Sequence, residues 1–471
     1  MDKSIIKLSS PTLETVNNVI DQGNEIYKMY SKIIDSYVLD FFTCSHWNRL
    51  PSSWRLFFKT ISPKDLAYIL DYDEKLLCSK IPPLSLLCLK NLMIYLSIPR
   101  LHQRSMTHDA TSNFKQIKLK DWCEIDKNKV MKLFWKNVKM KKQHELSEFA
   151  EYTYQMALKS NCNIVVDVGA GLGHLCRLLC YGYNLRVVGI EAQDELVLQA
   201  RKLNEGFERL ASKYAPNFKD KHPHTPHNLK LTIKEDMCPQ ELSKLLQSIL
   251  NISSADLSFG IVGLHPCGDL GPILLNIYKN SPNVRFVNVV GCCYMKLSSG
   301  LSLSSPHFSP VNINSRFELS YHAREIACHA IEAYMEKLQS EKYWELKVHS
   351  YRATLEKILN EKYPQFRYKA LASVKYTEDM TFAEYCEKAL KKLPLRLSHD
   401  DVYSDEILEC LSQWRHVMTF YTVRLMFAPI IETLIILDRY LHILPVGHSF
   451  IDTIFDPNVS PRNFVVTGLK K

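Results

Sequence analysis

Apolar and polar positions follow two different periods along the chain, and the change of period divides it into segments. From Thr12 to about Leu101, apolar residues recur at spacings of three and four, as in amphipathic helices. From Asn163 to about Leu297, short apolar runs rich in valine and isoleucine alternate with helical segments. This alternation predicts repeated strand–helix units and hence an α/β fold with a parallel, doubly wound sheet.

Five runs in the central segment have the length and composition of buried strands. Helical patterns separate them, among them Asp194–Ala211 and Gln240–Leu250 and a helix that ends near Tyr278. The predicted strands are Ile164–Val168, Leu185–Ile190, Leu229–Ile233, Leu257–Leu264 and Val284–Val290.

Helical patterns return after the fifth strand, at Arg324–Leu338 and in a long apolar helix at Thr422–Leu437. Two short strands, His448–Ile454 and Asn463–Gly468, flank turn residues and predict a C-terminal hairpin on the sheet edge. The polar residues 102–120 are interpreted as a linker or loop. We therefore expect an all-helical N-terminal domain (1–125), a core (126–340), an insertion (341–404) and a C-terminal part of the core (405–471).

The composition of the 471 residues, 46% hydrophobic and 23% charged, is that of a soluble protein. No apolar run is long enough to span a bilayer, and the N-terminus has no signal-peptide pattern. Fourteen cysteines without a disulfide framework indicate reduced thiols, so we expect an intracellular protein, cytoplasmic or nuclear.

The net charge of +9 permits an acidic partner such as RNA without requiring one. Basic residues gather between Lys115 and Lys142, including Lys127 and Lys129. They are either a solvated helix face or a ridge that contacts phosphates, with Phe134 and Trp135 available for stacking.

A glycine-rich turn directly follows the first predicted strand. Gly169, Gly171 and Gly173 lie between Asp167 and a helix that begins at His174. Glycine tolerates the sharp turn, and the helix N-terminus offers unpaired N–H groups to an anionic or polar ligand. The turn therefore predicts a nucleotide-type pocket.

The other predicted strands end in polar or glycine-rich residues at the same sheet edge, where ligands of such sheets bind. These ends are Glu191, Asp236, His265–Asp269 and Gly291–Tyr294. Glu191 has the spacing of an acid that binds ribose hydroxyls. The glycines read G-x-G-x-G, with His174 where a dinucleotide fingerprint has its third glycine. This favours a single nucleoside with an amino-acid tail over a nicotinamide dinucleotide.

These motifs resemble S-adenosylmethionine-dependent methyltransferases of the Rossmann-like class I, and more narrowly the methyltransferase-like protein 25 family. Some members of that family are labelled ribosomal RNA adenine dimethylase domain-containing. The resemblance is carried by Lys141–Glu145, Val166–Leu175, Gly263–Leu270, Val290–Tyr294, and the C-terminal Phe455–Pro457 and Ser460–Asn463. An Asn/Asp-Pro-Pro-Tyr/Phe loop, typical of amino-directed nucleic-acid methyltransferases, is not found after the fourth strand. His265–Gly268 and Cys292–Tyr294 also resemble loops of a tRNA ribose 2′-O-methyltransferase family.

The resemblance implies S-adenosyl-L-methionine as the cofactor. Gly169, Gly171 and Gly173 would border its methionine part and Asp167 its ammonium, while Lys142 and His144 would contact its carboxylate. Glu191 would hold the ribose and Asp236 would accept from the adenine amino group.

At the acceptor side, His265 or Asp269 is the expected base and Tyr294 is expected to stack on or orient the acceptor. No metal site is predicted, because Cys267, Cys292, Cys293 and His265 lack paired C-x₂-C spacing. The sequence thus predicts a methyltransferase acting on a macromolecule, RNA ahead of protein. The alternative is a cofactor-binding scaffold or pseudoenzyme without transfer activity.

Overall fold

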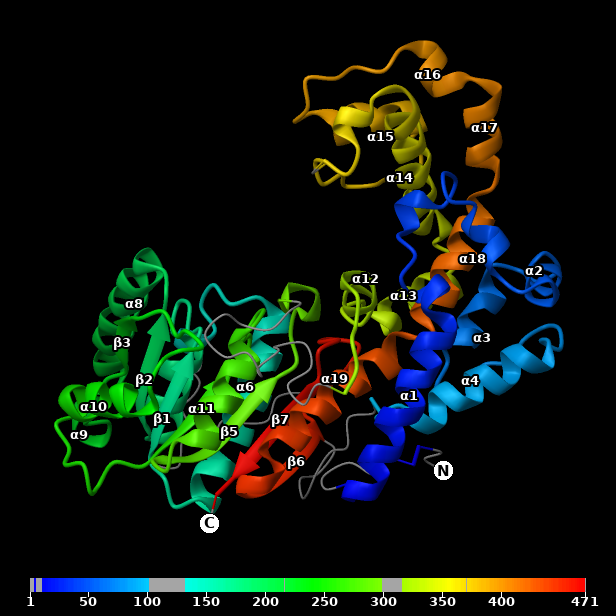
Figure 1. Cartoon of the computed structure of the whole chain (residues 1–471). Helices are drawn as coiled ribbons and strands as arrows, with labels where there is room; N and C mark the ends of the chain where they lie inside the picture. Colours follow the sequence, from blue (N-terminus) through cyan, green and yellow to red (C-terminus); the bar gives the residue numbers. More distant parts are fainter. Residues whose placement is uncertain are drawn as a thin grey trace. The chain divides into compact units, whose positions relative to one another are not determined.

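The computed structural model describes residues 4–5, 11–100, 132–215, 217–298, 316–369 and 371–470. It divides into two compact units (Figure 1). The helical unit comprises Met1–Ile5, Asp21–Ser97 and Ser320–Glu432, and the sheet unit comprises Ile6–Ile20, Ile98–Leu319 and Thr433–Lys471. The predicted linker 102–120 and the predicted boundary at 125/126 lie outside the described residues.

The sheet unit is built on seven strands in the order β3-β2-β1-β4-β5-β7-β6. Strands β1 to β5 are parallel, and β7 runs antiparallel to both β5 and β6. The predicted Rossmann-like class I sheet with its C-terminal hairpin is therefore confirmed. The strands are β1 (Ile164–Val168), β2 (Arg186–Glu191), β3 (His227–Lys230), β4 (Phe259–Gly263), β5 (Val284–Val290), β6 (His448–Thr453) and β7 (Phe464–Leu469).

Helices cover this sheet, with α8 packed on β2 and β3 and α11 on β4 and β5. Their bounds are α6 (Met140–Lys159), α7 (His174–Arg177), the π-helical turn η4 (Leu178–Gly182), α8 (Asp194–Tyr214), α9 (Phe218–Lys221), α10 (Pro239–Leu250), α11 (Leu270–Asn280), η5 (Tyr294–Lys296), α19 (Ala428–Ile443) and η7 (Leu444–Val446). The first five residues of α19, from Ala428 to Glu432, belong to the helical unit.

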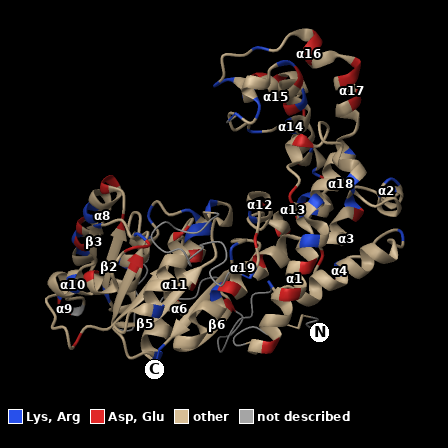
Figure 2. Cartoon of the chain, viewed as in Figure 1, with Lys and Arg blue, Asp and Glu red and all other residues tan. Residues whose placement is uncertain are grey.

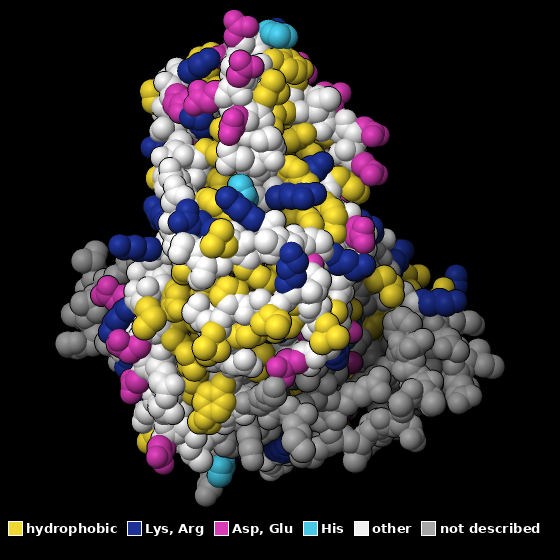
Figure 3. Space-filling model, turned by 90° about the vertical axis from the view of Figure 1, so that its right-hand side faces the viewer, with side chains coloured by type: hydrophobic (Ala, Val, Ile, Leu, Met, Phe, Trp, Pro, Cys, Tyr) yellow, Lys and Arg dark blue, Asp and Glu magenta, His cyan; other side chains and the backbone are white. Residues whose placement is uncertain are grey.

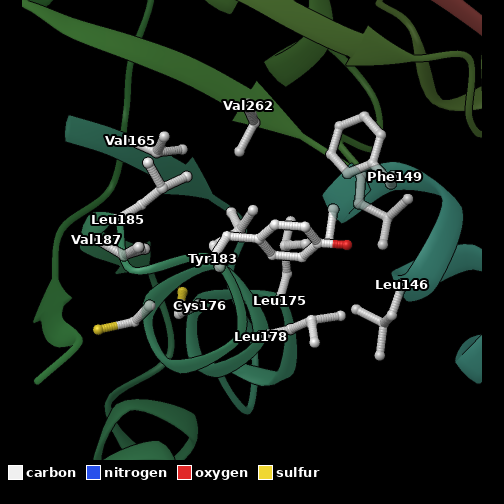
Figure 4. Close-up of a cluster of buried hydrophobic side chains, with 14 of the residues drawn as sticks. Leu146, Phe149, Val165, Leu175, Cys176, Leu178, Tyr183, Leu185, Val187 and Val262 are labelled. Carbon is white, nitrogen blue, oxygen red and sulfur yellow. The ribbon is translucent and has the colours of Figure 1, made fainter. Parts of the chain in front are cut away.

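A hydrophobic cluster joins β1, β2 and β4 to α6 and α7 (Figure 4). Phe149 from α6 and Leu175 from α7 point into it beside Val165, Val187 and Val262 of the strands. Strand β1 is buried along its whole length, as expected for a parallel strand covered on both faces. This packing holds the carboxyl end of β1 in place.

The helical unit has its own hydrophobic cluster, in which Leu355 and Leu359 of α14 meet Phe382 and Tyr385 of α15. The segment 341–404, predicted as an insertion, thus supplies core residues to this unit. Its elements are α1 (Leu13–Ile34, shared with the sheet unit), η1 (Val38–Asp40), η2 (His46–Arg49), α2 (Ser52–Phe58), η3 (Lys64–Leu66), α3 (Ala67–Leu70), α4 (Leu84–Leu96), α12 (Tyr321–Ile326), α13 (Ile331–Gln339), α14 (Tyr343–Lys362), η6 (Pro364–Phe366), α15 (Phe382–Leu390), α16 (His399–Tyr403), α17 (Asp405–Ser412) and α18 (Trp414–Leu425).

Two predicted helices are interrupted in the structure. The segment Arg324–Leu338 turns at residues 327–330, between α12 and α13. The apolar run Thr422–Leu437 breaks between α18 and α19. Pro429 lies in the first turn of α19, where the missing N–H costs nothing, whereas inside a continuous helix it would remove a hydrogen bond. The third strand begins and ends earlier than predicted, because hydropathy marks an edge strand weakly.

The segment Trp414–Val446, which includes the break between α18 and α19, is long and apolar enough to cross a membrane by length and composition, so the expectation that no apolar run reaches this length was wrong; its apolar window is entirely buried within the structure. The face shown in Figure 3 carries hydrophobic side chains interspersed with Lys and Arg.

Candidate functional site

The glycine loop after β1 has the backbone that the sequence predicts. Gly169, Gly171 and Gly173 have φ of 79°, 55° and 67°, in the left-handed region that favours glycine. A Cβ built on Gly171 would meet no atom within 4 Å, so the space over this residue is open. The loop therefore presents bare backbone to an open space beside the N-terminus of α7.

Glu191, the last residue of β2, is hydrogen-bonded to this loop. Its Oε2 accepts from the Gly171 N–H at 2.9 Å and its Oε1 from the Gln193 N–H at 3.1 Å. A half-buried carboxylate thus stands at the rim of the open space, where the ribose hydroxyls of a nucleoside need an acceptor. The open glycine backbone and this acceptor fit S-adenosylmethionine.

Asp167 lies on β1 beneath the loop and is only 3% exposed. Its Oδ2 accepts the thiol proton of Cys176 at 3.3 Å. Burial raises the pKa of this carboxyl to about 6, because removal from water disfavours the charged form. Asp167 is thereby placed to support the loop, and a cationic ligand group nearby would favour its ionised form.

Gly189 of β2 is a site residue that the sequence analysis missed. A Cβ on it would lie 2.7 Å from Sγ of Cys176 and 3.1 Å from Cβ of Ala170. Its hydrogen side chain lets α7 and the glycine loop approach β2 closely, the task of the third glycine in a dinucleotide fingerprint. A glycine within a β-branched strand was the available signal.

Asp236, the predicted acceptor for the adenine amino group, is more exposed to solvent than its neighbour Glu235. Asp236 is exposed in the turn after β3, whereas Glu235 is half-buried. Oε1 of Glu235 is shielded from solvent and has no hydrogen-bond partner among the described residues. Both carboxylates follow the segment in which the Leu231 N–H bonds to the Glu191 carbonyl.

The two predicted contacts from α6 differ in their surroundings. Lys142 is exposed, and its charge acts to lower the pKa of Asp167, although burial dominates there and raises it. His144 accepts the Asp456 N–H on Nε2 at 3.1 Å and packs edge-on against Phe455. His144 therefore holds the turn between β6 and β7.

A carboxylate–imidazole pair joins α6 to the loop after β4. Nε2 of the exposed His265 lies 3.2 Å from Oε2 of Glu145, a residue that is 4% exposed. Oε1 of Glu145 accepts from the Ser460 hydroxyl at 2.7 Å. Burial acts to raise the pKa of Glu145, but the hydrogen bonds from His265 and Ser460 outweigh it, so the pKa is lowered. The ionised carboxylate accepts the Nε2–H and leaves Nδ1 of His265 to take up a proton. The sequence indicates His265 as a candidate base, whereas no pattern in it indicates that Glu145 is the partner of this imidazole.

The other two predicted acceptor-side residues differ from His265, because Asp269 is hydrogen-bonded within the fold and Tyr294 is buried. Oδ1 and Oδ2 of Asp269 accept from the Ser298 N–H at 2.8 Å and from its hydroxyl at 2.7 Å. Tyr294 is 1% exposed and its ring lies 5.3 Å from the guanidinium of Arg439. Burial leaves Tyr294 no free face for a stacked acceptor, so of the three residues only His265 presents an exposed group.

Three cysteines of the loops after β4 and β5 lie close to one another. Sγ of Cys267 lies 3.2 Å from Sγ of Cys292 and 3.7 Å from Sγ of Cys293. A hydrogen bond from Cys292 lowers the pKa of Cys267 below that of an ordinary thiol. We refer to Cys267, Cys292 and Cys293 as the thiol cluster.

The described part of the basic segment is exposed. Figure 2 shows charges of both signs along the helices, and Lys132, Lys136, Lys139, Lys141 and Lys142 are all exposed. Lys127 and Lys129 lie outside the described residues. Phe134 is not available for stacking, because it is 6% exposed and packs on Phe207 in the core.

Comparison with known proteins finds similarity to methyltransferases. A family model described as "Methyltransferase domain" matches residues 141–300. The mouse (Mus musculus) protein named probable methyltransferase-like protein 25 is 31% identical over 230 residues, which is 45% of this chain and 37% of that protein. The human (Homo sapiens) protein of the same name is 29% identical over 229 residues, with the same coverage. The match thus spans little more than a third of these relatives' length.

Among solved structures, the plantazolicin methyltransferase BpumL in complex with SAH is 12% identical, with a TM-score of 0.21 over 63% of this chain and 88% of that one. The same enzyme with a pentazolic desmethylPZN analog and SAH is 16% identical, with a TM-score of 0.22 over 47% of this chain and 70% of that one.

Proposed function

We propose that this chain methylates a macromolecule with S-adenosylmethionine as donor. Residues 141–300 match a methyltransferase domain, and the chain is related to methyltransferase-like protein 25. The observation that carries this proposal is the open glycine loop with the Glu191 carboxylate hydrogen-bonded at its rim. The loop accommodates a polar ligand, and the acid provides the acceptor that a ribose requires.

Two groups of residues have different roles: one binds the cofactor at the glycine loop, and the other transfers the proton of the acceptor. S-adenosylmethionine, when bound, supplies a methyl group on a positively charged sulfur. Asp167 and Glu191 offer carboxylates to its ammonium and ribose. His265, held by Glu145 through Nε2, removes the acceptor's proton on Nδ1. The buried Glu145 stabilises the imidazolium that results and fixes the ring, as a buried acid does for a catalytic histidine.

RNA is the acceptor that we favour over protein. The five exposed lysines from Lys132 to Lys142 lie directly before and within the first turn of α6, the helix that also carries Glu145. Exposed lysines neutralise phosphates without reading sequence, so the ridge supports RNA binding and leaves the modified atom to the pocket.

Calorimetry with S-adenosylhomocysteine tests the cofactor part of the proposal. Gly171→Arg fills the open space and strains a left-handed position, so binding should fall at least tenfold. Gly206→Arg is the matched control, because Gly206 also faces open space but lies within α8, away from the loop. Unchanged affinity in Gly171→Arg, or no affinity in the folded wild type, overturns the proposed pocket.

Transfer of tritiated methyl groups to fractionated RNA and protein tests the acceptor. We expect label in RNA, and its loss in Lys136→Glu/Lys139→Glu but not in the α8 charge control Lys202→Glu/Lys213→Glu. Label in protein alone contradicts the RNA assignment. Cofactor binding without transfer to either fraction supports the scaffold alternative.

A further inference from the structure

The thiol cluster has the geometry of a metal site, although its residues lack the spacing by which such sites are recognised in a sequence. Cys267 belongs to the loop after β4, and Cys292 and Cys293 to the loop after β5. Their three Sγ atoms are separated by 3.2, 3.7 and 3.8 Å. All three sulfur atoms lie within 4.8 Å of one another.

These separations fit one face of a tetrahedron around zinc. Sulfur ligands at about 2.3 Å from a tetrahedral zinc ion lie about 3.8 Å from one another. Two of the three observed separations have this value within 0.1 Å, and the third, between Cys267 and Cys292, needs to widen by about 0.6 Å.

Contacts other than those of the thiols hold the two loops of the cluster together. Ser298 donates two hydrogen bonds to the carboxylate of Asp269, which ties the loop after β5 to the loop after β4. Gly268 adds a close approach, because a Cβ there would lie 3.1 Å from the Lys296 carbonyl oxygen. Turns within each loop bond the Cys267 N–H to the His265 carbonyl and the Lys296 N–H to the Cys293 carbonyl. The two loops are therefore organised before any ion arrives.

The ligand atoms suit a thiophilic cation. A cavity of about 10 Å³ beside the cluster is lined by Cys292 and Cys293 but not by Cys267, and Arg439 also lines it, so the ion would lie at the face that the three sulfur atoms share and not in this cavity. The soft thiolates select zinc or copper(I) over magnesium and calcium.

We propose that Cys267, Cys292 and Cys293 bind one Zn²⁺ ion at the carboxyl ends of β4 and β5. Within the residues that the structure describes, no His, Asp or Glu atom completes this group. The three cysteines thus leave the fourth position to a ligand from outside the cluster, the arrangement of zinc sites that keep a position open. This proposal does not depend on methyl transfer.

Metal analysis of the reduced full chain tests the site. Purified protein should contain about one zinc per chain, and Cys267→Ser/Cys292→Ser/Cys293→Ser should contain none. Cys238→Ser is the matched control, since Cys238 is an exposed thiol of the same unit outside the cluster, and it should retain zinc. A single Cys293→Ser variant should weaken zinc at least tenfold in competition with a chelator, since even outer-shell changes cost about 10–100-fold.

Cobalt substitution of the wild-type chain tests ligation without any variant. Co²⁺ should give intense sulfur-to-cobalt charge-transfer absorption and the strong visible bands of a tetrahedral site. Equal metal content in the triple variant and the wild type means adventitious metal and overturns the proposal. A disulfide between Cys267 and Cys292 in protein that takes up no metal after reduction also overturns it and identifies a redox pair. Calorimetry with S-adenosylhomocysteine on the same samples reports cofactor binding separately.

Discussion

At the scale of the residue, Asp167 links stability to function through its burial. Its pKa is raised from 3.8 to about 6, so the folded state binds a proton more tightly than the unfolded one. The free energy of unfolding should therefore fall as pH rises from about 4 to about 6, by at most about 3 kcal/mol. Asp167→Asn should remove this dependence, be more stable at pH 7 without ligand, and bind S-adenosylhomocysteine more weakly. Urea unfolding across this pH range and calorimetry check both parts. Lower stability of Asp167→Asn than of the wild type at pH 7 would show that the ionised carboxylate of Asp167 has favourable partners in the folded state.

The Glu145–His265 pair gives a second prediction at this scale. Despite burial, the hydrogen bonds from His265 and Ser460 lower the pKa of Glu145 below 4.5. Its stabilising contribution is therefore present at neutral pH and is lost as pH falls through the lowered value. His265→Ala should reduce kcat about 10²- to 10³-fold if the imidazole is the base. Glu145→Gln should reduce it about tenfold, and the double variant should be no slower than His265→Ala, because the acid acts through the histidine. Additive losses in single-turnover rates would assign Glu145 a separate role.

At the scale of the element, Gly189 sets the distance between β2 and α7. Gly189→Ala places a methyl group 2.7 Å from Sγ of Cys176 and should cost about 1–3 kcal/mol of unfolding free energy by overpacking. Cys176→Ala in the same chain should recover most of that loss, because it removes the opposing sulfur. Gly206→Ala, with open space around its Cβ, is the control and should be neutral or stabilising. If Gly189→Ala and Gly189→Ala/Cys176→Ala lose the same unfolding free energy, the strain does not come from the contact with Cys176.

The elements also show which parts of the site a sequence can predict. The glycine loop and Glu191 are set by residues near in sequence, and Gly171 and Glu191 form their hydrogen bond across 20 positions. Glu145 and His265 are 120 positions apart, so no local pattern reveals the pair. Topology predicted that the loops of the thiol cluster are neighbours, but only side-chain positions show the three sulfur atoms in contact. For Tyr294, the aromatic ring suggested stacking on the acceptor. In the structure, Arg439 and Gly291 lie against this side chain instead.

At the scale of the whole molecule, the predicted segments regroup into two units with separate hydrophobic clusters. Residues 21–97 form one unit with 320–432, an association over hundreds of positions that periodicity does not encode. Hydrophobic patterns identify the face that a helix buries and leave its partner undetermined.

This division predicts where a cofactor changes local stability. S-adenosylhomocysteine at 100 times its Kd should stabilise the conformation that binds it by about 2.7 kcal/mol. Hydrogen exchange should therefore slow in β1, the glycine loop, α7 and the end of β2, which share the hydrophobic cluster and the Glu191–Gly171 bond. The core of α14 and α15 belongs to the other unit and should exchange at the same rate with and without ligand, so it serves as the internal control. Slower exchange in α14 and α15 of the same size as in β1 would mean that the two units open together, and the ligand would then report on the stability of the whole chain.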